Sequence, residues 1–360
     1  NQLEKISTPQ KNIQHNYAIA SLQAFLEVGK SLIFSEPRIS EYQQQLMDSL
    51  QRALPEKVFQ ASIDFGNQVA QDIIAYANAD NYNQTRGFRY TIMEEPGKWQ
   101  PTPPAYMDAI EPNWNKIRPF VLDSANQFVP PPPTPFSLEK GSRFYNELME
   151  VYETGKNLTD EQKEIASFWD CNPYVMHTMG HAMYATKKIT PGGHWMGIVQ
   201  VANKQAEAKL MQSVQAYMLV SITLADAFIS CWDEKYRSNL IRPETVIDAH
   251  VDDTWDPLLQ TPPFPEYTSG HSVISEAAAT MLTHLYGNSF AFADSVEVKY
   301  GLPVREFDSF HHAAEEAAIS RLYGGIHYRP AISNGLAQGA QVGKYLVEKL
   351  AGSDQVAMKE

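Results

Sequence analysis

The sequence predicts an all-α protein, and three observations support this fold class. Apolar residues recur at spacings of three and four along most of the chain, which is the periodicity of amphipathic helices. Clear runs that alternate apolar and polar residues, as a half-buried strand would, are absent from the sequence. No internal repeat is visible, so solenoids and propellers are excluded. Together these patterns favour helical bundles.

The expected helices follow from the apolar stripes and from the residues that flank them. Residues 57–79 carry one stripe, and Pro55 stands where a helix can begin, because its fixed φ suits a first turn. The longest stripe runs from Leu210 to Trp232 and predicts a long, largely buried helix. The other expected helices cover residues 12–32, 141–153, 159–168, 269–286, 307–321 and 330–350.

Proline clusters separate the expected helices, and the most prominent lies at residues 129–135. Proline lacks an amide proton and fixes φ, so such runs form ordered loops or extended spacers. This run is the predicted boundary between an N-terminal helical half, residues 1–130, and a C-terminal helical bundle, residues 131–360, within one integrated fold. Residues 80–115 form a long irregular segment, which is either a functional lid or a packed cover.

Charge and composition argue against two classes of protein. The 29 Lys+Arg and 42 Asp+Glu residues give a net charge of -13, which is unsuited to a general nucleic-acid binder. The most apolar segment, residues 216–232, is interrupted by polar side chains such as Asp226, which argues against a membrane-embedded enzyme. The chain begins at Asn1 without a methionine, so removal of an export signal and a periplasmic or secreted location are expected.

Cysteine and histidine spacings do not indicate a metal site by themselves. Cys171 and Cys231 are expected to be buried free thiols, and one bridge between them is the alternative. The pair His177-x3-His181 has the spacing of two ligands on one helix face, but no Glu follows His177 as in a zinc-protease helix. Packing or hydrogen bonding is therefore favoured over zinc binding for this pair.

Three short motifs in the C-terminal half place cations, histidines and backbone amides at expected helix boundaries. They are Lys235-x6-Arg242-Pro243, Thr268-Ser269-Gly270-His271 and Ser320-Arg321-x5-His327. A helix N-terminus carries unpaired N–H groups and a positive dipole end, so the Ser269 and Gly270 amides are suited to hold a tetrahedral oxyanion. The three cations would neutralise its charge, and each arginine can bind two oxygens. The motifs predict an anion cage with two histidines on opposite sides.

The motifs, in this order, resemble the signature of the superfamily that joins type 2 phosphatidic acid phosphatases, class A bacterial acid phosphatases and vanadium-dependent haloperoxidases. The resemblance covers about residues 232–330 and implies helical bundles with the site at the end of one bundle. It implies that His327 bonds vanadium, or phosphorus in a phosphatase, and that His271 is the acid–base partner on the opposite side. The oxyanion ligands that it implies are Lys235, Arg242, Ser269, Gly270 and Arg321.

One departure from the phosphatase pattern concerns the residue that orients the nucleophilic imidazole. The phosphatase motif continues His-x3-Asp, whereas Ala331 stands four residues after His327 in this sequence. The missing carboxylate argues against a phosphohistidine intermediate. The partner of the second ring nitrogen of His327 is open among Asp308, a backbone carbonyl and water.

Aromatic residues near the motifs favour the haloperoxidases. Trp232 precedes Lys235 by three residues, which places both on one helix face, and Phe264 precedes His271 by seven. In the resemblance both aromatic positions border the halide pocket of vanadium chloroperoxidases, whereas phosphatases generally need a more open, polar approach. The alternative is that both rings are simply core residues. Tyr174 is a further candidate to border the pocket.

The preferred interpretation is a vanadium-dependent haloperoxidase, specifically an iodide peroxidase, with vanadate as its cofactor. The resemblance implies hydrogen peroxide and halide as substrates, His327 as the vanadium ligand, and His271 and Lys235 as the groups that assist and polarise peroxide. An organic halogen acceptor is a candidate partner, and a monomer without nucleic-acid or membrane partners is expected. The alternatives are a soluble acid phosphatase, with His327 as nucleophile, and a non-catalytic phosphate-binding protein.

Overall fold

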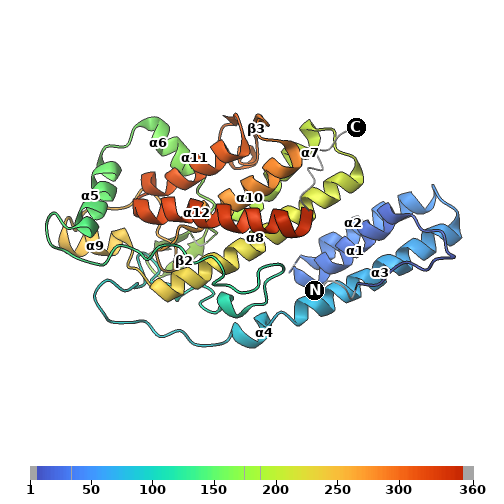
Figure 1. The fold of residues 1–360 in the computed structure, drawn as a ribbon, viewed down its shortest axis with the longest axis horizontal. Coiled ribbons are helices and arrows are strands. Elements are labelled where there is room, and N and C mark those ends of the chain that lie inside the picture. Colours follow the sequence, from blue (N-terminus) through green and yellow to red (C-terminus); the bar gives the residue numbers. More distant parts are fainter. Residues whose placement is uncertain (1–5, 34, 174, 187, 352–360) are drawn as a thin grey trace. The chain divides into compact units, whose positions relative to one another are not determined.

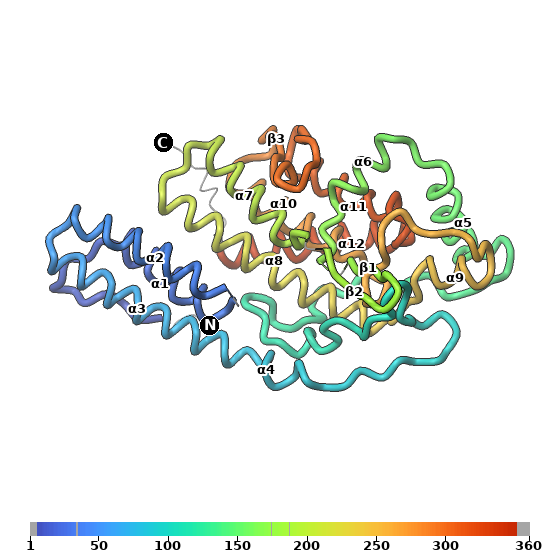
Figure 2. Tube along the Cα trace, turned by 180° about the vertical axis from the view of Figure 1, so that it is seen from behind, coloured from blue at the N-terminus to red at the C-terminus, as the bar shows by residue number. Residues whose placement is uncertain are grey.

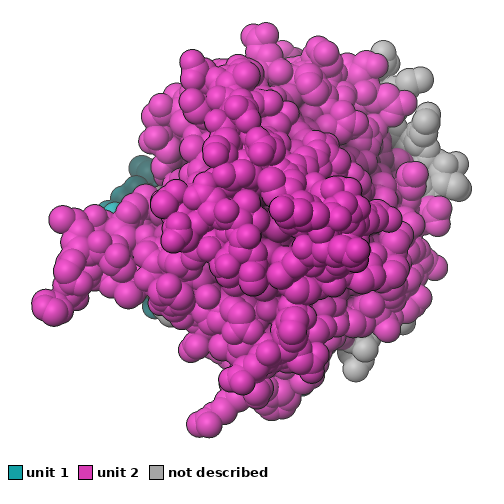
Figure 3. All heavy atoms as spheres, turned by 90° about the vertical axis from the view of Figure 1, so that its left-hand side faces the viewer, with its two compact units in different colours: residues 1–84 teal, residues 85–360 magenta. Residues whose placement is uncertain are grey.

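The structure, a computed structural model, confirms the all-α class with helical bundles (Figure 1). It describes residues 6–33, 35–173, 175–186 and 188–351. The chain forms two compact units, unit 1 with residues 1–84 and unit 2 with residues 85–360, coloured teal and magenta in Figure 3. The division therefore falls at residue 84, whereas the sequence predicts a boundary at residues 129–135.

Unit 1 is a set of three helices around its own small core. They are α1 (Tyr17–Leu32), α2 (Glu36–Gln51) and α3 (Glu56–Asn78). The side chain of Asn16 accepts hydrogen bonds from the amides of Ala18 and Ile19, which explains why α1 begins at residue 17 rather than 12. Helix α2 is not among the expected helices, although Ile39, Leu46, Met47 and Leu50 recur at helical spacing and pack on this core.

Unit 2 contains the remaining helices, and each helix expected there occurs with ends shifted by a few residues. A short helix, α4 (Tyr82–Thr85), spans the boundary between the units. The helices of unit 2 are α5 (Arg143–Lys156), α6 (Asp160–Phe168), α7 (Pro191–Gln205), α8 (Leu210–Ser238), α9 (Pro243–His250), α10 (Gly270–Tyr286), α11 (Phe310–Tyr323), α12 (Arg329–Leu346) and the short η2 (Trp114–Lys116), η3 (Val298–Tyr300) and η4 (Val347–Ala351). The sequence does not predict α7, which opens with Pro-Gly-Gly, a composition typical of turns.

Two short antiparallel strand pairs interrupt the helices (Figure 2). They are β1 (Met176–Met179) with β2 (Ala182–Ala185), and β3 (Phe292–Asp294) with β4 (Arg305–Phe307). His177 and His181 therefore lie on a hairpin, and the helical ligand spacing inferred for them is wrong. The His177 Nε2 atom is 2.7 Å from the Thr186 hydroxyl, a hydrogen bond that explains the residue without a metal.

The helix α8 is the central element of unit 2. By length and composition it is apolar enough to cross a membrane, so the polar side chains that interrupt residues 216–232 do not exclude a span as the sequence argument held. In the structure, 56% of its most apolar 18-residue stretch is buried in the protein. Its residues Leu219, Val220 and Ala227 belong to the main core, to which α7, α10 and α11 also contribute. Packing within the protein therefore accounts for the apolar composition of α8.

A buried carboxylate on α8 explains why the irregular segment before the proline run belongs to unit 2. The fully buried Asp226 accepts hydrogen bonds from the amides of Phe120, Val121 and Leu122 at 2.7, 2.8 and 2.9 Å. Three bonds to one buried charge hold this segment against the bundle. The proline run follows it as a spacer inside the unit, not as a link between units.

Helices α10 and α12 approach each other closely because glycine recurs at every fourth residue of α12. A Cβ atom on Gly339 would lie 2.2 Å from the carbonyl oxygen of Val273, and one on Gly335 or Gly343 would also meet α10 at under 3.0 Å. Side chains at these positions would force the helices apart. The close approach places the N-terminus of α10 directly against α12.

We expect Gly339→Ala to destabilise the protein by about 1–3 kcal/mol, the cost of overpacking a filled core. The sign of the change in stability is informative, because Gly→Ala inside a helix otherwise stabilises a protein by about 0.5–1 kcal/mol. Urea unfolding measures the change. The matched control is Ser333→Ala at an exposed position of the same helix, expected within about 0.5 kcal/mol of the parent protein. A Gly339→Ala protein more stable than the parent would contradict the close contact.

Candidate functional site

Three cations are buried together where α8, α9 and α11 end or begin. Lys235 lies in the last turn of α8, Arg242 is the N-cap of α9, and Arg321 lies in the last turn of α11. Each is at most 1% exposed. A cavity of about 120 Å³ lies beside them and is lined by both predicted histidines, His271 and His327. The structure thus brings the three sequence motifs together.

Lys235 is held by the loop that precedes α10. Its ammonium donates to the carbonyl oxygens of Pro265, Glu266 and Thr268 at 3.1, 3.1 and 2.6 Å. An ammonium has three donors, so in this arrangement all are directed at the loop, and Lys235 does not line the cavity. Burial lowers its pKa to about 8. Lys235 would therefore stabilise an anion in the cavity through its positive charge and not through a direct hydrogen bond.

The two arginines keep donors without an acceptor. Arg242 Nε donates to the Phe264 carbonyl at 2.9 Å, and its Nη1 donates to the Ile326 carbonyl at 2.8 Å and lies 3.3 Å from His327 Nε2. Arg321 Nη1 lies 3.2 Å from His271 Nε2. Within the described part of the chain, Arg242 Nη2 and Arg321 Nε and Nη2 are buried without a hydrogen-bond partner.

These unpaired donors fit a bound tetrahedral oxyanion. A buried donor without an acceptor costs about 1–3 kcal/mol, and more when it is charged. Burial also lowers the pKa of both guanidinium groups, that of Arg242 to about 10. An anion in the cavity would supply acceptors and negative charge at once. Vanadate and phosphate both meet this requirement.

A carboxylate that the sequence analysis missed orients His327. The Nδ1 atom of His327 is 2.8 Å from Glu266 Oε1, which also accepts the amide proton of Tyr328 at 2.9 Å. Burial and the charge of Arg242 lower the pKa of His327 well below its usual value, so the ring is neutral. Its Nδ1–H then donates to Glu266, and Nε2 keeps a lone pair that can bond a ligand.

The identity of this partner corrects two inferences from the sequence. Asp308, a backbone carbonyl and water were the expected candidates, and the partner is Glu266, 61 residues before His327. The missing Asp at position 331 therefore does not leave the ring without a carboxylate, and it no longer argues against a phosphohistidine intermediate. The only sequence signal for Glu266 was an acidic residue inside an apolar, proline-rich loop.

The start of α10 offers one amide to an anion and not two. The amide of Ser269 donates to the carbonyl of Ala331 at 3.0 Å, and the Ser269 hydroxyl caps the helix by accepting from the amide of Ser272. The prediction that the Ser269 amide is available is therefore wrong. Gly270 is the first residue of α10 and lines the cavity, and its N–H has no acceptor within the helix.

His271 follows Gly270 and faces the cavity beside Arg321. Burial and the neighbouring charge of Arg321 lower the pKa of His271 well below its usual value. A neutral imidazole at the cavity surface can accept a proton from a ligand. This is the property required of the acid–base group that the motif predicts.

Aromatic rings form the apolar side of the cavity. Trp232 and Phe264 both line it, with ring centroids 5.0 Å apart, and the Phe264 centroid is 5.0 Å from Lys235 Nζ. Ile110 and Trp114 complete this wall, and the Trp232 indole donates to the Ile110 carbonyl at 3.2 Å. The irregular segment at residues 80–115 thus supplies part of the cavity wall. Tyr174, also predicted at the pocket, lies outside the described residues.

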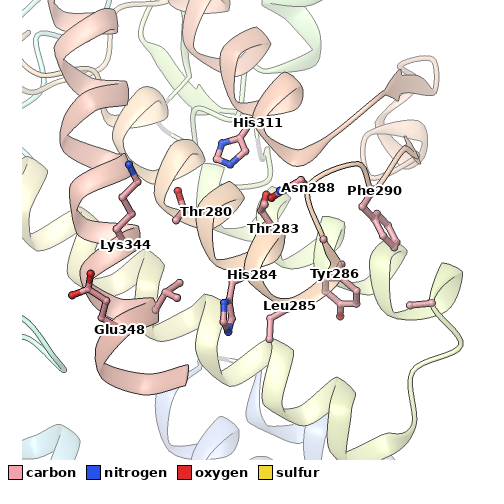
Figure 4. Close-up of a pocket in the computed structure, with 13 residues that line it drawn as sticks. Thr280, Thr283, His284, Leu285, Tyr286, Asn288, Phe290, His311, Lys344 and Glu348 are labelled. Carbon is pink, nitrogen blue, oxygen red and sulfur yellow. The ribbon is translucent and has the colours of Figure 1, made fainter. Parts of the chain in front are cut away.

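A larger cavity of about 580 Å³ lies on another part of unit 2 (Figure 4). It is lined by residues of α10, α11 and α12 such as His284, His311 and Lys344. Lys344 is exposed, and His311 Nδ1 is 2.9 Å from Glu276. Arg321, His271 and His327 line the smaller cavity and none of them lines this one, so the smaller one is the candidate active site.

Comparisons with known proteins bear on the fold and the family of the chain. A family model described as the VCPO second helical-bundle domain matches residues 215–353. A bacterial vanadium-dependent iodoperoxidase is 53% identical, with a TM-score of 0.89, over 96% of this chain and 82% of that one. Holo- and apo-type structures of a bacterial vanadium-dependent chloroperoxidase share the fold, at 19% and 18% identity and TM-scores of 0.66 and 0.68. They cover 92% of this chain and 81% and 83% of their own chains. No curated protein matches the chain.

The contact between Glu266 and His327 predicts that vanadate binding weakens in steps from the parent protein to Glu266→Gln and then to Glu266→Ala. Glu266→Ala removes the acceptor of His327 Nδ1–H and should weaken vanadate binding about 10–100-fold, as expected for a partner of a metal-bound histidine. Glu266→Gln keeps an oxygen acceptor without the charge and should lie between this variant and the parent. Equilibrium dialysis with vanadate measures the affinities. Equal affinities for Glu266→Ala and the parent would show that Glu266 does not position His327.

Proposed function

The chain belongs to the vanadium-dependent haloperoxidases, and we propose that it uses hydrogen peroxide to oxidise iodide in preference to bromide and chloride. The observation that supports this proposal is the group of unpaired arginine donors beside a neutral histidine nitrogen. This set of groups suits vanadate, which takes oxygen-directed hydrogen bonds and one nitrogen ligand. Export, a monomeric state and an organic halogen acceptor stay predictions from the sequence.

Each residue of the site has a defined task in this reaction. His327 Nε2 would be the ligand for vanadium, and Glu266 keeps the ring in the tautomer that frees Nε2. Arg242 and Arg321 donate to the oxygens, and Lys235 adds positive charge from behind the loop. Bound vanadate supplies a Lewis-acid centre that activates hydrogen peroxide without changing its own oxidation state.

His271 is positioned to move the proton of hydrogen peroxide. It lines the cavity, and its lowered pKa keeps the imidazole neutral and able to accept a proton. Arg321 lies 3.2 Å from its Nε2 atom and disfavours the protonated state. The proton that His271 accepts is therefore readily given up again, as is required when one peroxide oxygen leaves as water and the other passes to the halide.

The walls of the cavity support iodide as the substrate. Iodide is the easiest of the three common halides to oxidise, and it is large and weakly hydrated. Entry into a cavity lined by Trp232, Phe264 and Ile110 costs iodide less hydration energy than it costs chloride. The 53% identical relative is an iodoperoxidase, which also favours iodide. The same two rings border the halide pocket in the chloroperoxidase resemblance, so groups beyond them also contribute to the preference.

A phosphatase is the second candidate, and the contact of Glu266 with His327 favours keeping it in the test. A carboxylate on Nδ1 would also activate this histidine as a nucleophile towards a phosphate ester. The two activities respond to vanadate in opposite directions. Vanadate restores a haloperoxidase and inhibits a phosphatase.

We expect the protein stripped of vanadate to be inactive, and added orthovanadate to restore strong oxidation of iodide, little of bromide and none of chloride. Steady-state assays at equal halide concentration, run beside hydrolysis of a generic phosphate ester, measure these activities. Bromide turnover comparable to that of iodide would remove the iodide preference. Ester hydrolysis that vanadate inhibits, without halide oxidation, would replace the haloperoxidase assignment for the purified protein.

The two histidines should separate cofactor binding from turnover. His327→Ala removes the ligand nitrogen and should abolish vanadate retention after gel filtration. His271→Ala should lose roughly 10²-fold or more in turnover, the contribution of a general acid–base group, while it keeps much of its vanadate affinity. An His327→Ala protein that retains stoichiometric vanadate, or an His271→Ala protein with parent turnover, would exclude the role given to that histidine.

A further inference from the structure

A second cluster of potential ligands lies next to the candidate active site. It consists of Cys171 from the loop after α6, His194 from α7 and Glu297 from the segment between β3 and η3. All three side chains are buried, and one ligand atom from each lies within 4.8 Å of the other two. Cys171 Sγ is 3.4 Å from His194 Nδ1, and this nitrogen is 3.1 Å from Glu297 Oε1.

We propose that Cys171, His194 and Glu297 bind one zinc ion, a site separate from the vanadate site. Thiolate, imidazole and carboxylate form a donor set that suits Zn²⁺ among the common divalent ions. Tetrahedral zinc with ordinary bond lengths separates its sulfur and nitrogen ligands by about 3.6 Å, and its nitrogen and oxygen ligands by about 3.4 Å. The observed separations are within a few tenths of an ångström of these values.

The surroundings of His194 match those of a metal-bound histidine. Its Nε2 atom is 2.7 Å from Asp294 Oδ2, so Nε2–H can donate to this carboxylate and leave the Nδ1 lone pair for a metal. Trp169 stacks on the imidazole at a centroid distance of 4.6 Å and fixes its plane. Asp294 is itself oriented by the amide of Val296, which donates to Oδ1 at 2.9 Å.

Glu297 supplies an independent indication of a ligand. Its side chain is more than nine-tenths buried, and its Oε1 atom has no hydrogen-bond partner of good geometry among the described residues. This is the oxygen that lies 3.1 Å from His194 Nδ1. The contact with His194 lacks hydrogen-bond geometry, and a cation bound to both atoms would give the buried oxygen a directed partner.

The site would connect three segments of the cavity wall. Cys171 lines the cavity that holds His271, whereas His194 and Glu297 lie behind it. Zinc would tie the loop after α6 to α7 and to the segment after β3. Its expected role is to fix the shape of this wall, and three protein ligands leave a fourth position for water.

Metal analysis of the full-length protein tests the proposal independently of vanadate. After removal of metals, the protein should take up about one zinc per chain from micromolar zinc, whether or not vanadate is present. Cobalt in place of zinc should produce a thiolate-to-cobalt charge-transfer band. Failure to take up zinc, or cobalt binding without this band, would overturn the proposal while leaving the halide activity unaffected.

Variants assign the ligands. Cys171→Ser should lose the cobalt band, whereas Cys231→Ser, at the other buried free cysteine, should retain it. Asp294→Asn should weaken zinc binding about 10–100-fold, because it alters only the partner of His194. Retention of the band in Cys171→Ser, or its loss in Cys231→Ser, would refute the assignment. If Cys171→Ser does not fold, the cobalt spectra of the parent and of Cys231→Ser decide whether Cys171 is the thiolate ligand, because a band that persists without Cys231 leaves Cys171 as its source.

Discussion

The buried ammonium of Lys235 organises the loop on which the rest of the site depends. Its three hydrogen bonds to carbonyl oxygens curl the backbone of residues 265–268 around one charge. That curl sets the direction of Glu266 towards His327 and brings the Phe264 carbonyl to Arg242. Thr268 extends the same arrangement, since its hydroxyl donates to Gln338 of α12. One lysine therefore links the end of α8 to the ligand histidine.

The buried positive charge of the site is costly for the fold when no anion is bound, and it is also what favours the binding of an anion. The three buried cations share the site with Glu266, a buried carboxylate whose pKa burial raises to about 7. Glu244 and Asp170 also favour the charged forms of Arg242 and Arg321. Burial, together with the positive charge of the neighbouring cations, lowers the pKa of both histidines and keeps them neutral, and arginine donors stay unpaired. A bound anion relieves this imbalance. The cofactor therefore completes the electrostatics of the fold as well as the reaction centre.

The residues proposed for the cage are found from the sequence because each of them lies at or near a helix end, and helix ends leave local signals. The stripe that predicts α8 also places Lys235 at its end, and the glycines after α11 place His327 in a turn. Glu266 is not predictable in this way, because its contact with His327 joins distant residues through a loop without periodicity. The cluster around His194 brings together three segments more than 20 residues apart, and no spacing rule connects them.

The apolar wall of the cavity and the cations of the anion cage are held in place by different groups, and Asp226 anchors the segment that carries the wall. Residues 120–122 are anchored on α8 by Asp226, two turns before Trp232, and the segment that precedes them supplies Ile110 and Trp114 to the cavity. None of the cage cations takes part in this anchor. Substitutions of the side chains at positions 110 and 114 would therefore change the size of the cavity for larger organic molecules while the anion-binding groups keep their own supports.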